Sequence, residues 1–208
     1  LNGMTVGVVA NRSKVYDEEG NVAETFDGTL TVDGCKKAAD FVEFCDAFGI
    51  PVLTLTNVTG FKACQCAEKA LARETAKLTY AFANATVPKV NVVIGKAFGS
   101  AYVTMNSKSI GADMVYAWPT AEIGMMDATP AVKIMYAKEI AESQNPAALI
   151  AEKAAEYTAM QASAMAAARR GYVDDIIKAD ETRQRVVAAF EMLFTKREDR
   201  PAKKHGTI

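Results

Sequence analysis

The feature that most constrains this fold is a series of short apolar runs separated by helical patterns. The runs are TVGVVA (5–10), IPVLTL (50–55), KVNVVIG (89–95) and ADMVYAW (112–118). They lack the alternation of apolar and polar side chains that marks a strand buried on one face only. Between them, apolar residues in segments 35–48 and 66–82 recur at the spacing of one helix face. The sequence therefore predicts an α/β fold in which helices cover a largely parallel sheet.

Local signals place the ends and connections of these elements. Asp33 is the predicted N-cap of the first helix, and Gly49 is its predicted C-terminal stop. The remaining expectations are a polar, turn-rich excursion at 11–28, a short strand or extended lead-in at 29–34, a loop at 56–61, a turn at Lys96–Gly99 and a helix from about Ser100.

Beyond TAEIGMM (120–126) the pattern becomes helical. Asn145-Pro146 is typical of a cap and first position, and it predicts a long alanine-rich helix ending at Gly171. Residues 172–177 are a predicted extended link, and Asp180 is the predicted cap of a last helix. We see no internal repeat or linker. One domain over residues 1–208, with a helical C-terminal appendage, is therefore expected.

Charge and hydropathy exclude several classes of function. The formal net charge is −1, which gives no overall field to attract nucleic acid or an anionic membrane. No apolar run reaches the roughly 20 residues that span a bilayer. The N-terminus LNGMTVGVV lacks the basic-then-apolar layout of a secretory signal, so a cytoplasmic protein is expected.

Cysteine and histidine usage limits the chemistry further. The cysteines at 35, 45, 64 and 66 are too few and too irregular for a disulfide scaffold. Cys64-Gln65-Cys66 has no second cysteine pair, so we predict reduced thiols and no metal site. The single histidine, His205, lies in the C-terminal tail. A histidine base or a Ser-His-Asp triad is therefore not expected.

The stretch VIGKAFGSAY (93–102) points to chemistry by backbone groups. A helix that begins at Ser100 has N–H groups without intrahelical partners, and its dipole favours an anion there. Gly99 allows a ligand to approach the backbone closely. Two such donors aimed at a carbonyl oxygen would stabilise an oxyanion. The alternative is that the glycines only permit tight packing of strand against helix. A phosphate-binding P-loop is excluded, because Lys96 follows the first glycine and not the second.

Seven segments, in this order along the chain, carry a family resemblance: GMTVGVVAN, KAADFVEFCDAFGIPVLTL, AKLTYAFANATVPKV, GKAFGSAY, GADMVYAWPTAEI, RRGYVDDII and KREDRPAKKHG. Together they resemble the C-terminal half of the carboxyltransferase component of biotin-dependent acyl-CoA carboxylases, especially the propionyl-CoA carboxylase beta type, and of related biotin-dependent decarboxylases. The resemblance implies a ClpP/crotonase-type spiral fold. It also implies that this chain is the biotin-side half of a site shared with an N-terminal half, and is inactive alone.

The implied activity is transfer of a carboxyl group between carboxybiotin, on a carrier protein, and a short acyl-CoA. The cofactor itself would accept the α-proton, so no protein base is required. The implied partners are the N-terminal-half subunit, the biotin carboxyl carrier protein and a biotin carboxylase or decarboxylase subunits, in a homo- or hetero-oligomer. Two alternatives stay open. One is the same transfer in reverse within an acyl-CoA decarboxylase, and the other is a non-catalytic structural subunit.

The resemblance also implies the site residues. The amides of Ser100 and Ala101, after Gly99, would form an oxyanion hole for the ureido oxygen of biotin. The pocket would be lined by Phe98, Val103, Gly60, Phe61, Met126 and Asp127. Phe61, Phe98 and Tyr102 have packing in the core as their alternative.

The sequence departs from the family at several of these places. Ser100 replaces the usual second glycine, and Val103 replaces an acidic residue found in some relatives. The segment after Phe61 (KACQCAEKALA) is one residue shorter, and GMMDATPAV brings in Asp127 and Pro130. A hydratase acting on its own would need carboxylates as acid and base, and Glu68 and Asp127 are the candidates.

Overall fold

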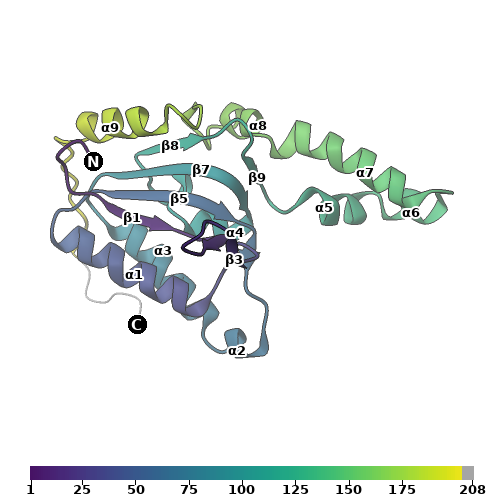
Figure 1. Cartoon of the computed structure of the whole chain (residues 1–208), viewed down its shortest axis with the longest axis horizontal. Coiled ribbons are helices and arrows are strands. Elements are labelled where there is room, and N and C mark those ends of the chain that lie inside the picture. Colours follow the sequence, from purple (N-terminus) through teal and green to yellow (C-terminus); the bar gives the residue numbers. More distant parts are fainter. Residues whose placement is uncertain (203–208) are drawn as a thin grey trace.

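The computed structural model describes residues 1–202 and is organised around one parallel sheet. The strand order is β1-β5-β7-β8-β10, with β9 paired to the end of β7 (Figure 1). These pairings are parallel, which confirms the predicted α/β class. The strands are β1 (Gly7–Ala10), β5 (Val52–Val58), β7 (Lys89–Phe98), β8 (Met114–Ala117), β9 (Glu122–Gly124) and β10 (Asp175–Ile176).

Helices cover both faces of this sheet. α1 (Val32–Ala47) and α3 (Leu71–Asn84) pack against each other on one side, and α9 (Thr182–Met192) lies on the other (Figure 1). Phe82 of α3 is buried in the larger core, and Phe190 of α9 packs with Val90 and Val92 of β7 in a smaller one. Burial of β7 on both faces explains why its sequence shows no alternation.

β7 is longer than predicted, and the expected turn at Lys96–Gly99 is wrong. The strand continues through Phe98, because β9 supplies backbone partners for the segment 96–98. The expected loop at 56–61 is also mostly extended. β5 runs to Val58, and β6 (Gly60–Phe61) pairs with β4 (Thr29–Leu30), so distant parts of the chain satisfy these backbone groups.

Two predicted N-caps are corrected. Thr31, not Asp33, caps α1, and its hydroxyl oxygen accepts the N–H of Gly34 at 3.1 Å. The strand β4 ends at Leu30, so the chain enters the helix two residues earlier than expected. Residue 181, not Asp180, is the N-cap position of α9, and it makes no side-chain capping bond. The predicted stop of α1 is confirmed, since Gly49 has φ +67° directly after the C-cap residue.

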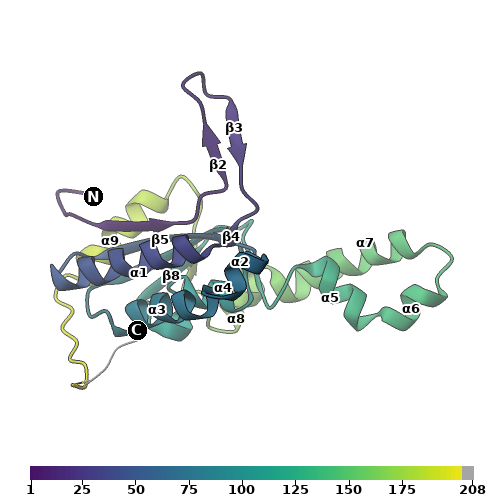
Figure 2. The ribbon, with the colours of Figure 1, turned by 90° about the horizontal axis from the view of Figure 1, so that it is seen from below.

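The predicted helix over 66–82 is divided into α2 (Gln65–Glu68) and α3. The polar excursion at 11–28 contains a hairpin of β2 (Lys14–Tyr16) and β3 (Val22–Thr25). This hairpin projects from the body of the molecule (Figure 2).

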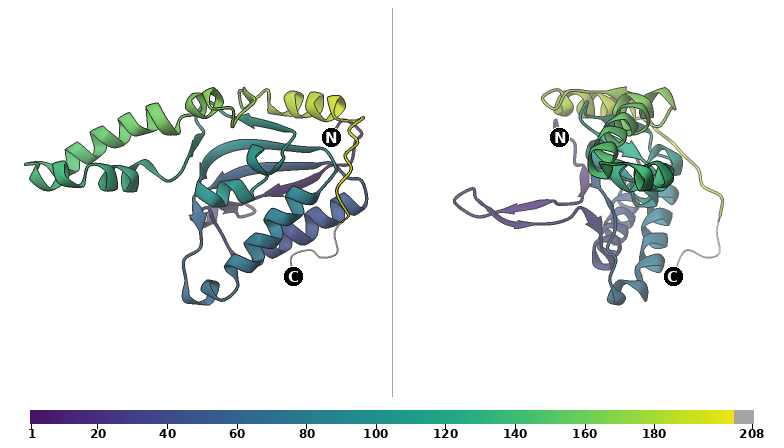
Figure 3. Two further views of the ribbon diagram at one scale, coloured as in Figure 1. Left: turned by 180° about the vertical axis from the view of Figure 1, so that it is seen from behind. Right: turned by 90° about the vertical axis from the view of Figure 1, so that its right-hand side faces the viewer.

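After β9 the chain forms a helical arm that extends away from the sheet (Figures 1 and 3). Its helices are α5 (Ala128–Met135), α6 (Ala137–Glu142) and α7 (Pro146–Tyr157). A π-helical turn (Thr158–Ala162) then leads back to α8 (Ala164–Arg169), which contacts β9 and β10 of the sheet. Asn145 caps α7 as predicted, its side-chain oxygen accepting the N–H of Ala148 at 3.2 Å. The predicted single helix to Gly171 is interrupted at Ser163, which is extended and caps α8.

Two short elements complete the description of the chain. A 3₁₀ turn (Lys108–Ile110) precedes β8, and β10 lies within the link predicted at 172–177. Along residues 1–202, no helix has the length and apolar character needed to cross a bilayer. His205 and the end of the segment KREDRPAKKHG lie outside the described residues.

Candidate active site

The turn after β7 sits at the carboxyl edge of the sheet. α4 (Gly99–Thr104) begins directly after the strand, with Phe98 as its N-cap residue. Gly99 has φ +60°, a left-handed conformation that glycine adopts without strain. A Cβ at this position would lie 3.0 Å from the carbonyl oxygen of Met125. Backbone conformation and lack of space therefore both require glycine at position 99.

Ser100 and Ala101 follow as the second and third residues of α4, where N–H groups have no intrahelical acceptor. Across the part of the chain that the structure describes, neither N–H donates to a backbone carbonyl elsewhere. Ser100 is exposed, whereas Ala101 is 1% exposed. The Ser100 carbonyl accepts the hydroxyl of Thr104 at 3.0 Å, which fixes the first turn of α4. The two donors are thus held rigidly, and the turn is open to solvent at Ser100.

The aromatic residues that flank the turn point into the interior. Phe98 is 3% exposed, and the Nζ of Lys96 lies 5.7 Å from its ring centroid. Tyr102 is also buried, and burial raises the pKa of its hydroxyl to about 12. The structure places both residues in packing positions. Val103, one turn into α4, is partly buried.

Gly60 and Phe61 lie next to this turn. They form β6, which contacts α4 and pairs with β4. Phe61 is partly buried against the larger core, so it packs and lies beside the turn at the same time. Gly60 has φ +157° and is partly exposed.

The segment that leads into the helical arm lies against the same turn. Besides the carbonyl of Met125 at Gly99, it contributes Asp127, whose Oδ1 accepts the N–H of Thr129 at 3.1 Å and caps α5. The side chains of Met125 and Met126 are 80% and 37% exposed. Two exposed apolar side chains therefore follow the carbonyl that lies against Gly99.

Lys96 and Asp127 set the charge at this position. The Nζ of Lys96 lies 2.8 Å from Oδ2 of Asp127, and both side chains are about 40% exposed. The hydrogen bond from Lys96 lowers the pKa of the Asp127 carboxyl, and the same bond raises the pKa of Lys96. Both groups are thus held in their charged forms, with water screening part of the attraction.

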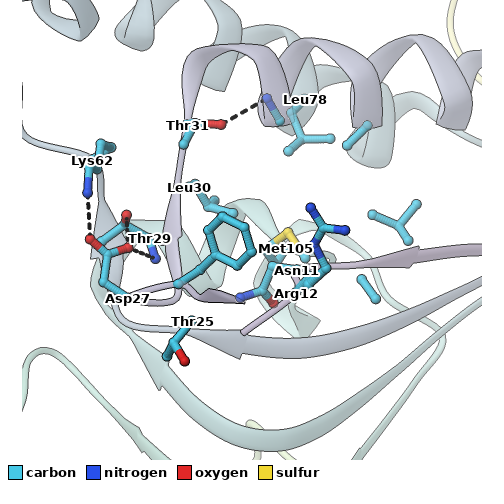
Figure 4. A pocket seen from close by; sticks show the side chains of 15 residues that line it. Asn11, Arg12, Thr25, Asp27, Thr29, Leu30, Thr31, Lys62, Leu78 and Met105 are labelled. Atoms are coloured by element: carbon cyan, nitrogen blue, oxygen red, sulfur yellow. Dashed lines mark hydrogen bonds and ion pairs between the residues drawn. The ribbon is translucent and has the colours of Figure 1, made fainter. Parts of the chain in front are cut away.

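A cavity of about 550 Å³ lies between the end of β1, the start of α1 and α3 (Figure 4). Its mouth carries the ion pair of Lys62 with Asp27, at 2.8 Å, and the Arg12 guanidinium, 5.0 Å from the ring centroid of Phe26. It is lined by residues 9–12, 25–27, 29–31, Gly34, Ala38, Lys62, Leu78 and Met105. None of the predicted site residues is among them.

Sequence reasoning missed three polar residues at the carboxyl edge of the sheet. Asn11 and Asn57 bond to each other through a side-chain oxygen and a backbone N–H at 2.9 Å, and Asn57 Oδ1 accepts the N–H of Lys96 at 3.0 Å. Asn57 and Lys96 also line a second cavity of about 420 Å³. All three residues follow a predicted strand directly or within two residues. Because binding sites in parallel α/β sheets lie at the carboxyl ends of the strands, this position could have marked them as candidates.

A family model, curated relatives and solved structures all match this chain to carboxyltransferases. Residues 1–208 match the family described as the carboxyl transferase domain. The whole chain is 47% identical to part of the methylmalonyl-CoA decarboxylase subunit alpha of Propionigenium modestum, covering 38% of that subunit. It is 46% identical to part of the propionyl-CoA carboxylase beta chain of Saccharopolyspora erythraea, covering 37% of it.

Among solved structures, transcarboxylase 12S matches with a TM-score of 0.86 at 43% identity. The match covers 97% of this chain and 37% of that one, which is described as a hexamer with methylmalonyl-coenzyme A and methylmalonic acid bound. The chain thus spans less than two-fifths of the length of these three relatives.

Proposed function

This chain belongs to the carboxyl transferase family, and we propose that it supplies the biotin-side half of an acyl-CoA carboxyltransferase site. Its fold is the crotonase-type α/β fold of the family's solved structures. The chain spans less than two-fifths of the length of these relatives. In this proposal the acyl-CoA side comes from the N-terminal half of the carboxyltransferase.

The unpaired amides of Ser100 and Ala101 carry this proposal. When bound, carboxylated biotin supplies the carboxyl group to the α-carbon of the acyl-CoA. The two amides would donate to the ureido oxygen, which gains negative charge as the carboxyl group leaves. Fixed donors aimed at developing charge need no reorganisation, and loss of one typically costs about 3 kcal/mol of transition-state stabilisation. The residues at the turn fit this group, since they offer two N–H donors, and the nearby Asp127 carboxylate is held by the Lys96 ammonium.

The surroundings of the amides suit a site shared between chains. Met125 and Met126 are exposed and belong to the segment whose carbonyl lies against Gly99, and a protein carrying biotin would cover them. A biotin carboxyl carrier protein is therefore a further proposed partner. A cytoplasmic homo- or hetero-oligomer follows from the same assignment. The near-neutral net charge of −1 accords with the absence of a nucleic-acid role.

The direction of transfer depends on the associated subunits. A biotin carboxylase would make the complex a carboxylase, and a decarboxylase subunit would run the same transfer in reverse. Copurification from the native source, followed by identification of the associated chains, distinguishes these two assignments.

The two carboxylates that a hydratase would use, Asp127 and Glu68, are in positions unsuited to acid–base catalysis. Asp127 is ion-paired to Lys96 and caps α5, and Glu68 is exposed on α2. Neither carries the desolvated environment of a proton-transferring acid. We therefore favour carboxyl transfer by backbone donors.

Reconstitution tests the proposed function. The chain would be combined with the segment that precedes it in its relatives, and transfer from methylmalonyl-CoA to free biotin measured. We expect activity from the pair and none from either half. Transfer by this chain alone would refute the half-site assignment. A correctly assembled pair without transfer would instead support a structural subunit.

A further inference from the structure

Two of the four cysteines lie together on the surface, in the segment that follows β6. The Sγ atoms of Cys64 and Cys66 are 2.6 Å apart in the segment that joins β6 to α3. Cys66 is exposed and Cys64 partly exposed, whereas Cys35 and Cys45 are buried. We propose that Cys64 and Cys66 form a reversible intramolecular disulfide, a redox modification site that is independent of carboxyl transfer.

The arrangement already brings the reacting atoms together. A disulfide bond is about 2.04 Å long, so the two sulfurs need to approach by only a small distance. Cys64 is the N-cap residue of α2 and Cys66 lies in its first turn, so local backbone structure positions both thiols. Their exposure allows a small oxidant to reach them, which the buried pair does not permit.

The two thiols are not equivalent. The hydrogen bond from the Cys66 thiol, and next the N–H of Ala67, lower the pKa of Cys64. The same partnership with Cys64 raises the pKa of Cys66. Since the thiolate is the nucleophile, Cys64 is the attacking sulfur and Cys66 the resolving one.

The step uses a small-molecule disulfide as oxidant. The Cys64 thiolate attacks one sulfur of the oxidant, forms a mixed disulfide and displaces one small thiolate. The Cys66 thiolate then attacks the Cys64 sulfur and displaces the second small thiolate. The protons of the two protein thiols pass to the two leaving groups, so the protein is oxidised by two electrons and the small disulfide is reduced.

The loop that closes is very short, with Gln65 as its only intervening residue. A disulfide across so few residues removes little entropy from the unfolded chain, and exposed disulfides are readily reduced. The bond is therefore suited to reversible modification. A metal centre is less well matched, because two thiolates leave a tetrahedral ion half-coordinated. Within residues 1–202 there is no group of three or more histidine, cysteine or acidic ligands to complete it.

The modified segment is connected to the candidate site through the elements on either side of it. The cysteines follow Phe61 of β6, which contacts α4. α2 in turn packs on α3, and α3 packs on α4. Closing the disulfide would fix the connection between these elements without altering the turn at Ser100.

Peptide mapping of the full chain tests this proposal. The folded protein is treated with a small disulfide such as 2-hydroxyethyl disulfide, alkylated after unfolding, and digested with trypsin. Cleavage after Lys62 and Lys69 releases ACQCAEK, which holds both cysteines. We expect this peptide to be lighter by two hydrogens and unalkylated, and to regain two alkylated thiols after reduction. Cys35 and Cys45 serve as internal controls that remain reduced.

Serine variants assign the two roles. In C66S the mixed disulfide on Cys64 should accumulate, and in C64S only a mixed disulfide on Cys66, with no intramolecular bond, should form. Two alkylated cysteines in ACQCAEK after the oxidant has modified an exposed model thiol would overturn the proposal. So would a disulfide that forms only between two chains. Neither readout depends on carboxyl transfer, so the result is separate from that of reconstitution.

Discussion

The Lys96 ammonium and the Asp127 carboxylate, 2.8 Å apart, join the end of β7 to the start of α5. Lys96 belongs to the strand that leads to the two open amides, and Asp127 caps the first helix of the arm. The Met125 carbonyl packs against Gly99 between these two points. The orientation of the arm and the shape of the turn are thus set by one group of contacts.

Substitution of Asp127 should separate its capping role from its ion pair. Asparagine caps helices as well as aspartate does, so D127N should cost only the ion pair, about 0.5 kcal/mol for a solvent-screened contact. D127A removes the cap as well and should cost about 1 kcal/mol more. Urea unfolding of the two variants measures the difference. Equal stability of D127N and D127A would show that the cap contributes nothing.

The pKa of Asp127 should also depend on Lys96. The hydrogen bond from Lys96 lowers the pKa of Asp127 in the folded state. The stabilisation from this pair is therefore fully present above the unfolded pKa of about 3.9, and is lost as the pH falls through the lower folded value. NMR titration should show a depressed pKa in the wild type and a higher one in K96M. An unchanged pKa in K96M would remove the ion pair as the cause.

Substitutions at Ser100 test the backbone donor in the assembled enzyme. S100G keeps the N–H and should retain transfer within a few-fold. S100P deletes the N–H at a position in the first helical turn where proline is tolerated, and should lower kcat by about 100-fold or more. Urea unfolding of both variants shows whether the fold persists. A well-folded S100P enzyme with normal turnover would exclude the amide from catalysis.

Gly99 should not accept a side chain. Alanine at φ +60° costs about 1 kcal/mol or more, and its Cβ would lie 3.0 Å from the Met125 carbonyl oxygen. G99A should therefore be less stable than wild type by about 1–3 kcal/mol. Gly3, with φ +78° and open space around it, provides the matched control, since G3A adds conformational strain without contact. A loss in G99A no larger than in G3A would show that the Met125 contact is unimportant.

Lys89 should give the protein a stability that rises with pH. It is fully buried, its Nζ donates to the Phe82 carbonyl at 2.7 Å, and desolvation lowers its pKa to about 8. Between pH 8 and the unfolded value of about 10.4, the unfolded chain binds the extra proton. The free energy of unfolding should therefore increase over this interval. In K89M the increase should be smaller, as urea unfolding from pH 7 to pH 10 would show. An identical pH profile in the variant would contradict the buried titration.

The sequence was sufficient for elements whose cause is local. The apolar runs at 50–55 and 89–95 mark β5 and β7, because strands buried on both faces need continuous apolar side chains. Asn145-Pro146 marks the start of α7, because capping is decided within one turn. Thr31 and Asp33 are both good capping residues two positions apart, and pairing of β4 with β6 decides between them.

What could not be predicted depends on partners distant in the chain. The extension of β7 over 96–98 requires pairing with β9. β9 is only three residues long, too short for its sequence pattern to predict a strand. The ion pair of Lys96 with Asp127, 31 residues apart in the chain, depends on contact between the root of the arm and the end of β7. The split between α2 and α3 falls among good helix formers, so propensity gives no sign of it. The start of α4 near Ser100 was predicted because Gly99, with φ +60°, is a position whose backbone conformation favours glycine.

β9 has a consequence for how this chain can change in length. It is hydrogen-bonded to the last residues of β7, the strand that leads into α4 and its two unpaired amides, and three residues separate it from α5, the first helix of the arm. Insertions or deletions near the tip, around α6, leave that register untouched. A change of length within β9 would shift its register on β7 and displace the Met125 carbonyl from Gly99. Natural variation in this region should therefore concentrate at the far end of the arm and spare its root.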